Sequence, residues 1–171
     1  MKQPDVKLNP QPRMRYEITA TIHGAPGALD AIEGHVDYEV SNPDCVPMTP
    51  VMGATVVPQK SVPVTFRRTG DNVYTGEIFL DRLQDEDYFN QGVCHWSVVG
   101  VAAAFRHGQV SFSPSIYKKD ILGKHDVVKY FSHASYEHAE RQRIDIGAND
   151  PQAFQSNATF SITMHAAERL P

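Results

Sequence analysis

The sequence predicts an all-β fold, specifically an immunoglobulin-like β-sandwich of about seven to nine strands with at most short helices. The first reason is the stretch from Gly92 to Ile116, which contains the longest apolar run of the chain. Within it, residues 94–105 are apolar on both period-two faces, which is typical of a strand at the centre of a sheet. The second reason is that turn-forming residues separate shorter alternating segments at fairly regular spacing, and no long helical pattern interrupts them.

The length of 171 residues suits one domain with a sizeable core. Residues 1–12 contain three prolines and predict a flexible tether, whereas residues 13–171 form a single β-sandwich domain. Trp96 follows the second cysteine instead of lying between the two cysteines, so the order typical of antibody domains is not present.

The first half of the chain alternates between apolar and polar side chains in several segments, which indicates half-exposed strands. The expected strands are residues 13–23, residues 32–40 with an acidic outer face, an edge strand at 54–57, and residues 62–66 and 74–80. The last two flank a turn at 69–72 and predict a hairpin. Residues 46–63 contain four prolines and predict a long crossover, because proline is confined to edges and loops.

The second half begins with the predicted central strand. Three successive alanines at 102–104 favour a helix. The β-branched residues, Gly100 and the hairpin signal at His107-Gly108 favour a strand instead. The other expected elements are strands at 110–116, 127–131 and 158–165, a polar connection at 117–124, a helical turn or solvated loop at 132–143, and a short helix at 151–154.

Composition excludes some classes of function. The apolar content of 41% and the charged content of 21% are ordinary for a soluble globular protein. The net charge of −4 disfavours nucleic-acid binding, which needs clustered lysine and arginine. No apolar run approaches the length of a membrane span.

Cys45 and Cys94 are the two cysteines, and we expect them to form a disulfide in an oxidising compartment. The alternative is two unrelated thiols. The first residues lack the apolar region of a signal peptide, so we expect a mature form whose leader, or lipid-bearing leader, has been removed. This interpretation predicts a periplasmic protein, either free or tethered to the membrane by lipid; a cytosolic protein is the alternative.

Catalytic signatures are weak. Eight histidines are scattered through the chain, but neither His133 with His138 and Glu140 nor His35 with Asp37 matches a specific zinc motif. No nucleophile elbow surrounds a serine. We therefore expect no enzyme activity, no cofactor and no metal, and a metal-dependent enzyme using the histidines is the weakest hypothesis.

Binding to another protein is the favoured role, with two candidate surfaces. The first combines carboxylates that steer a basic partner with aromatic anchors. Its residues are Asp81, Asp85, Glu86, Asp87, Tyr88 and Phe89. The alternative is a solvated loop with both aromatics packed into the core. The second surface comprises Tyr130, Tyr136, Glu137 and His138, and its alternative is a loop that covers one sheet.

Several features together resemble bacterial periplasmic immunity proteins, the antitoxins that protect cells from toxins of type IV and type VI antibacterial secretion systems. These features are the proline-rich start, the lone cysteine pair, the acidic sandwich and the run Gly-Val-Cys-His-Trp-Ser-Val-Val-Gly-Val. In particular, the chain looks similar to the immunity proteins of the type IV antibacterial system of Xanthomonas-like bacteria. The resemblance covers layout over most of the chain and carries no catalytic motif.

The resemblance implies a periplasmic protein that binds one cognate toxin and neutralises it by occlusion. The alternative function is a carbohydrate-binding or adhesion module of the bacterial envelope, in which Trp96 or Tyr38 would stack on sugars. The oligomeric state stays open.

Overall fold

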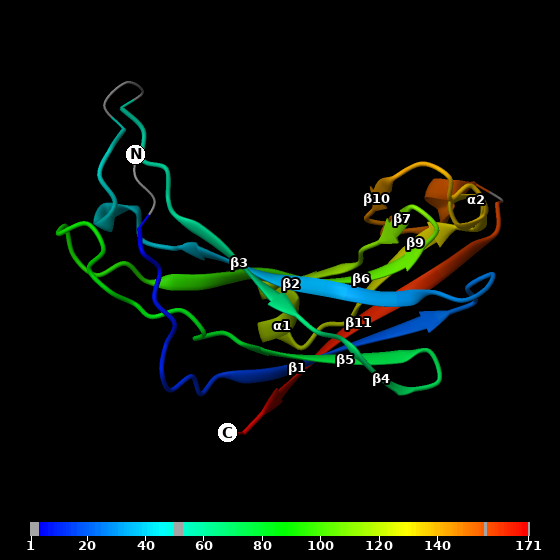
Figure 1. Cartoon of the computed structure of the whole chain (residues 1–171), viewed down its shortest axis with the longest axis horizontal. Coiled ribbons are helices and arrows are strands. Elements are labelled where there is room, and N and C mark those ends of the chain that lie inside the picture. The colour runs from blue at the N-terminus through cyan, green and yellow to red at the C-terminus, as the bar shows by residue number, and fades with distance from the viewer. Residues whose placement is uncertain (1–3, 50–52, 156, 171) are drawn as a thin grey trace.

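The structure, a computed structural model, describes residues 4–49, 53–155 and 157–170. It is a two-layer β-sandwich, which confirms the predicted all-β class (Figure 1). The strands in chain order are β1 (Arg15–His23), β2 (Asp30–Val40), β3 (Gln59–Val64), β4 (Arg67–Gly70), β5 (Val73–Phe79), β6 (Trp96–His107), β7 (Val110–Phe112), β8 (Ser115–Tyr117), β9 (Val127–Ser132), β10 (Arg143–Asp145) and β11 (Thr159–Arg169). The helical pieces are η1 (Pro43–Cys45), α1 (Lys118–Gly123), α2 (His133–Glu137) and η2 (Pro151–Phe154).

The first sheet has the strand order β4-β5-β1-β11-β9. The second sheet has the order β10-β7-β6-β2-β3, and β8 pairs with β6 beside β7. Of the strands in the described residues, β4, β7, β8 and β10 are only three or four residues long. The remaining seven strands of the described residues have six residues or more, and seven lies within the predicted range of seven to nine.

The alternation in the sequence explains the strands at the centre of each sheet. In β1, Ile18, Ala20 and Ile22 are buried, and the residues between them lie on the outer face. In β2, Val36 and Tyr38 face the core and leave the acidic side chains outside. This matches the predicted half-exposed strands.

A β-bulge changes the faces of β6. Its register against β2 shifts between the pairs Asp37–Gly100 and Tyr38–Val98, so Val99 is an extra residue. Val98 and Val101 therefore both reach the core, although three positions separate them. Val99 is 36% exposed, so the predicted burial of β6 on both faces is wrong at this residue.

Aromatic side chains fill the space between the sheets. Phe112 of β7 lies 5.4 Å from Phe131 of β9 and 5.3 Å from Phe160 of β11, measured between ring centroids. Tyr38 is 1% exposed, and its hydroxyl donates a hydrogen bond to the Phe79 carbonyl oxygen of the opposite sheet. Burial raises the pKa of the Tyr38 hydroxyl above its ordinary value, because the charged phenolate would lose its hydration.

Two predictions for the region between β2 and the end of β5 are wrong. Residues 54–57 form no strand, because β2 ends at Val40 and its last pair with β3 is Glu39–Gln59. Residues 62–66 do not form a hairpin with residues 74–80. Instead β3 pairs with β2 in the second sheet, the chain crosses the core at Phe66, and β4 forms the hairpin with β5. Residues 50–52 of the predicted crossover lie outside the described residues.

The predicted polar connection at 117–124 is also wrong, because it contains α1. The helix buries Ile121 completely against the core, and its other side chains are solvated. One buried residue in six gives no helical periodicity, which is why the sequence pattern did not indicate it.

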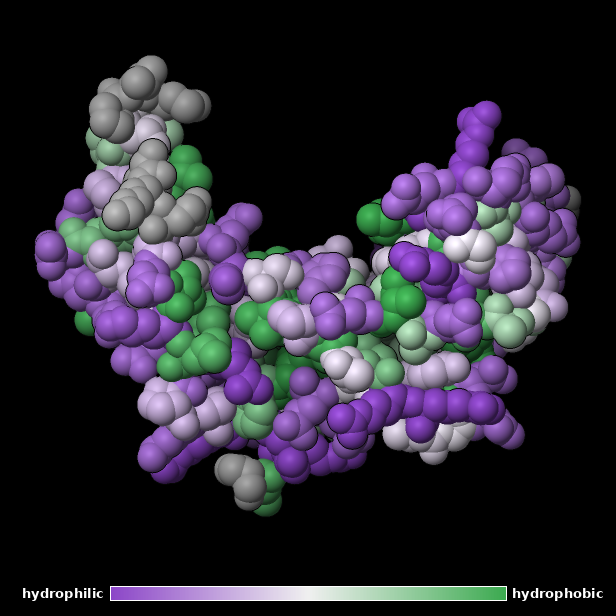
Figure 2. All heavy atoms as spheres, in the orientation of Figure 1, coloured by the Kyte–Doolittle hydropathy of each residue, from purple (hydrophilic) through white to green (hydrophobic). Residues whose placement is uncertain are grey.

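The sandwich is hollowed on one side. In Figure 1 the second sheet lies above the first, and the chain rises at both ends of it. One raised end contains the segment that follows β2, and the other contains α2 and β10. Figure 2 shows the concavity between them, with apolar side chains on its floor and inner walls. We call the outer face of the second sheet between these ends the hollow.

Candidate functional site

The floor of the hollow is made of small side chains. Val101, Ala103 and Phe105 of β6 face the core, so Gly100 and Ala102 face outward. The neighbouring β8 places Ser115 beside Ala102 and Tyr117 beside Gly100. A Cβ atom on Gly100 would lie 3.0 Å from the Cδ1 atom of Tyr117, so this half-exposed ring extends across the floor.

An acidic strip borders the floor on the β2 side. His35, Asp37 and Glu39 alternate with buried residues and therefore point into the hollow. The His35 Nε2 atom lies 3.4 Å from an Asp37 carboxylate oxygen, and both side chains are about half exposed. The carboxylates of this strip are groups that basic partners recognise.

The opposite border is apolar. Ile144 of β10 pairs with Ser111 of β7, on the strand face opposite the core residues Val110 and Phe112. Ile144 is 73% exposed, and Ile146, two residues further on, is 68% exposed. Sequence reasoning missed both isoleucines. Their i, i+2 spacing within a polar segment was the available signal.

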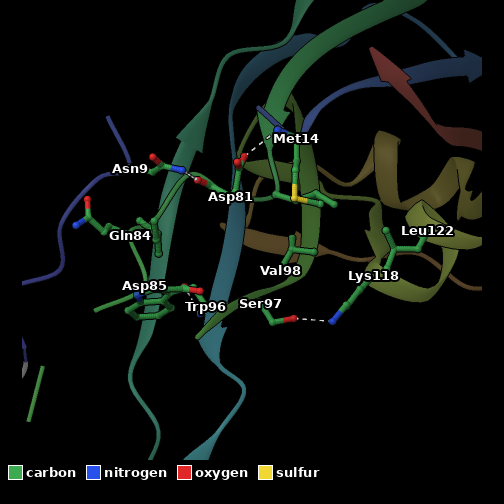
Figure 3. Close-up of a pocket in the computed structure, with 12 residues that line it drawn as sticks. Asn9, Met14, Asp81, Gln84, Asp85, Trp96, Ser97, Val98, Lys118 and Leu122 are labelled. Atoms are coloured by element: carbon green, nitrogen blue, oxygen red, sulfur yellow. Dashed lines mark hydrogen bonds between the residues drawn. The ribbon is translucent and has the colours of Figure 1, made fainter. Parts of the chain in front are cut away.

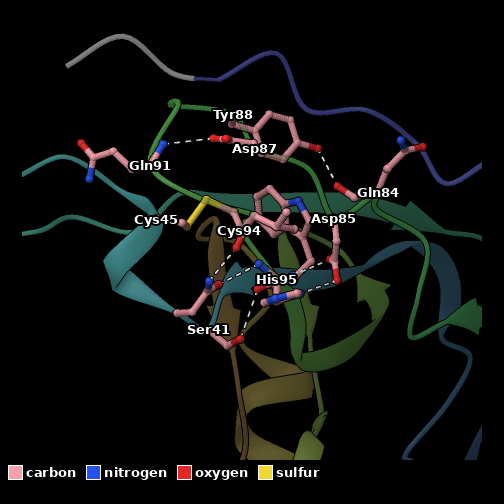
Figure 4. The surroundings of a disulfide bond; sticks show 12 residues. Ser41, Cys45, Gln84, Asp85, Asp87, Tyr88, Gln91, Cys94 and His95 are labelled. Atoms are coloured by element: carbon pink, nitrogen blue, oxygen red, sulfur yellow. Dashed lines mark hydrogen bonds and ion pairs between the residues drawn. A yellow bond between two sulfur atoms is a disulfide. The ribbon is translucent and has the colours of Figure 1, made fainter.

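The acidic loop, residues 81–90, is the first candidate surface predicted from the sequence, and most of its carboxylates are engaged within the protein. Both oxygens of Asp81 accept from the backbone N–H of Arg13, and one also accepts from Met14. Glu86 forms an ion pair of 3.0 Å with Lys7. Figure 4 shows Asp85 beside His95 and Asp87 beside Gln91.

The aromatic side chains of this loop pack against the protein and are only partly exposed to solvent. Tyr88 donates its hydroxyl to the Gln84 carbonyl oxygen, and its ring lies edge-on to Trp96. Tyr88 and Phe89 pack against a small cluster that surrounds the buried disulfide between Cys45 and Cys94. The predicted disulfide is confirmed, and the loop has the packed form given as its alternative. Substitutions in the loop would therefore alter the fold as well as the surface.

Part of the predicted tether lies against this loop. Leu8 pairs with Leu83 in an isolated antiparallel bridge, and the Asn9 N–H donates to the Arg82 carbonyl oxygen at 2.8 Å. The first three residues of the tether lie outside the described residues. Residues 7–13 thus help to hold the acidic loop in place.

The second predicted surface lies at the raised end that contains α2. Tyr136 stacks on His107 with ring centroids 3.7 Å apart and donates to the Ala28 carbonyl oxygen, so its ring is held in place. Glu137 and His138 are exposed. Tyr130 is half-buried, and its backbone pairs with Ala148.

A cleft of about 450 Å³ opens at one edge of β6, between the segment around Asp81 and helix α1 (Figure 3). Its apolar lining consists of Met14, Leu80, Leu83, Trp96, Val98 and Leu122. Lys118 reaches across its mouth and donates to the Ser97 hydroxyl at 2.7 Å. Of the ten residues predicted to bind a partner, only Asp81 and Asp85 line this cleft, together with Leu83 and Gln84 of the acidic loop.

The arrangement of cysteine, histidine and acidic side chains bears on catalysis and metal binding. Cys94 is oxidised in the disulfide, so it cannot act as a nucleophile beside His95. Within residues 4–49, 53–155 and 157–170, no three histidine, cysteine or acidic side chains are grouped so that they could hold a metal ion. In the same residues, no helix has the length and apolar character needed to cross a membrane.

Of the two aromatics named for sugar stacking, only Trp96 is partly exposed, and it lines the cleft described above. Tyr38 is fully buried between the sheets, and Trp96 is partly buried beneath Tyr88. Comparisons with protein-family models, with curated proteins and with solved structures found no match.

Proposed function

We propose that the chain is an immunity protein that binds a cognate antibacterial toxin in the hollow and neutralises it by occlusion. The observation that carries the proposal is the pairing of exposed apolar side chains with an acidic strip on one concave face. Exposed isoleucines at one border and the half-exposed Tyr117 on the floor offer apolar and aromatic anchors of the kind that protein interfaces use. Isolated apolar residues are common on surfaces, but their concentration around a hollow indicates a binding face.

The acidic strip supports a basic partner. Asp37 and Glu39 lie side by side on the same face of β2, and the whole chain carries a net charge of −4. Complementary charge accelerates encounter and fixes the orientation of a partner. A basic toxin surface that enters the hollow would lose access to its own substrate, which is the occlusion we propose.

The disulfide supports a periplasmic location, because disulfides persist in oxidising compartments. We propose that the mature protein acts there, either free or attached by a lipid to a membrane.

The test is co-expression in the periplasm with the effector encoded beside this chain in its source genome. The informative variant is Ile144→Asp with Ile146→Asp. The matched control is Leu170→Asp, because Leu170 is 83% exposed and belongs to neither border of the hollow. We expect the wild type and the control to protect the cells and the double variant to lose protection while circular dichroism stays unchanged. Full protection by the double variant would reject the hollow, and no protection by the wild type would reject the immunity function.

A further inference from the structure

We infer that the cleft at the edge of β6 binds a small amphipathic anion, with an apolar body and a single carboxylate. The cleft adjoins the hollow, because Ser97 pairs with Glu39 of the acidic strip, but none of the residues named for the hollow lines it. This inference therefore does not depend on the proposed function. It exists because β8 ends at Tyr117 and the chain turns into α1. The edge of β6 before Gly100 therefore has no strand neighbour on that side within the described residues.

The interior of the cleft suits an apolar body. Leu83 and Val98 at its base are 3% and 4% exposed and belong to the main core. Met14 and Leu122 at its rim are 49% and 48% exposed, although both are large apolar side chains. A ligand that covered these rim residues would remove apolar surface from water, which is favourable by about 25 cal/mol per Å². The volume of about 450 Å³ lies in the usual range for small-molecule sites.

The polar groups of the cleft differ in how far they are satisfied. The Asp81 carboxylate accepts from two backbone N–H groups, with distances of 2.9 Å to both Arg13 and Met14. The Asp85 carboxylate accepts from the backbone N–H of Trp96 at 2.9 Å, and its other oxygen lies 2.9 Å from His95 Nδ1. Both carboxylates therefore already accept hydrogen bonds from groups of the protein.

Lys118 and the unpartnered indole N–H of Trp96 are less fully satisfied than these carboxylates, and Lys118 is the charged one of the two. Its ammonium group donates one hydrogen bond, to the neutral Ser97 hydroxyl, and it forms no ion pair in the part of the chain that the structure describes. Two of its three N–H groups remain available to an acceptor. A carboxylate is the acceptor that gains most from a cation, because charge-assisted hydrogen bonds are the stronger ones. Figure 3 shows Lys118 extending from α1 toward Ser97, with Val98 and Met14 on one side of this bond.

The probe for this site is decanoate, and the reporter is the emission of Trp96, the only tryptophan and a residue that lines the cleft. We expect a saturable change in emission on titration, and isothermal calorimetry as a second readout. Loss of the charge in Lys118→Gln should weaken binding by about tenfold or more, as expected when a charged hydrogen bond is removed. Lys118→Arg should retain binding.

The matched control is Lys119→Gln, because Lys119 is the adjacent exposed lysine and does not line the cleft. It should bind decanoate as the wild type does. Decyltrimethylammonium, which has the same chain length and the opposite charge, should bind at least about tenfold more weakly than decanoate. Equal affinity of the Lys118→Gln and Lys119→Gln variants, equal affinity for both surfactants, or no saturable binding would each overturn the inference. The experiment uses the isolated chain without a toxin, so its result is separate from that of the immunity test.

Discussion

Removing the disulfide should destabilise the protein by about 4 kcal/mol, the value that the chain-entropy model gives for a loop of this length. Cys45 and Cys94 are 49 positions apart, so their bond closes a long loop of the unfolded chain. The perturbation is Cys45→Ala with Cys94→Ala. Because small domains are stable by only about 5–15 kcal/mol, the loss is a large part of the total.

The folded structure should survive this change, since other contacts hold the same junction. The Asn42 side chain donates to the Val93 carbonyl oxygen and accepts from the His95 N–H, both at 2.7 Å. Both sulfur atoms lie in a small buried cluster with Val40 and Val46, so the alanines also leave a small cavity. That cavity should add about 1 kcal/mol.

The assay is equilibrium unfolding in urea, with the free energy of unfolding extrapolated to water. A reductant should lower the stability of the wild type toward that of the double variant and leave the double variant unchanged. A loss below about 1 kcal/mol would refute the reasoning, because the entropy of closing the loop could not then be the main contribution.

Three further outcomes are expected. Gly34→Ala should lower the free energy of unfolding in urea by about 1–3 kcal/mol, because its Cβ atom would clash with a backbone oxygen of β6. The control Gly70→Ala has room for a Cβ atom and should lower it by less than about 0.5 kcal/mol. Equal losses would contradict this. Tyr38→Phe should reduce the loss of folding stability that the wild type shows above about pH 10. A hydroxyl whose pKa is raised on folding contributes stability that is present below its unfolded pKa and is lost as pH rises through the folded pKa. Parallel curves of stability against pH for the two proteins would argue against this. Asp81→Ala should speed hydrogen exchange at Arg13 and Met14, because it removes the carboxylate that accepts from their backbone N–H groups. Unchanged exchange would show that other contacts hold this segment.

The central strands were predictable because their environment is encoded locally. Alternation in β1 and β2 follows directly from one face lying on the core. The disulfide was predictable for a different reason, because only two cysteines are present.

The acidic loop was not predictable from its own residues. The Asp81 carboxylate binds backbone groups 67 and 68 positions away, so a local pattern cannot distinguish it from a solvated charge. Ile144 was missed for a related reason. It lies on a three-residue strand whose parallel pairing with β7 depends on the assembled sheet.

The bulge at Val99 sets how β6 tolerates insertions and deletions. Val99 is an extra residue in β6, so deleting it would leave the residues before and after it in one regular alternation of inward and outward side chains. Val98 and Val101 would then lie two positions apart in a regular strand, so both would still face the core. Deleting Val99 should therefore cost little more than the contacts of one half-exposed valine, whereas deleting one residue between Val101 and Phe105 would turn part of the strand to the opposite face.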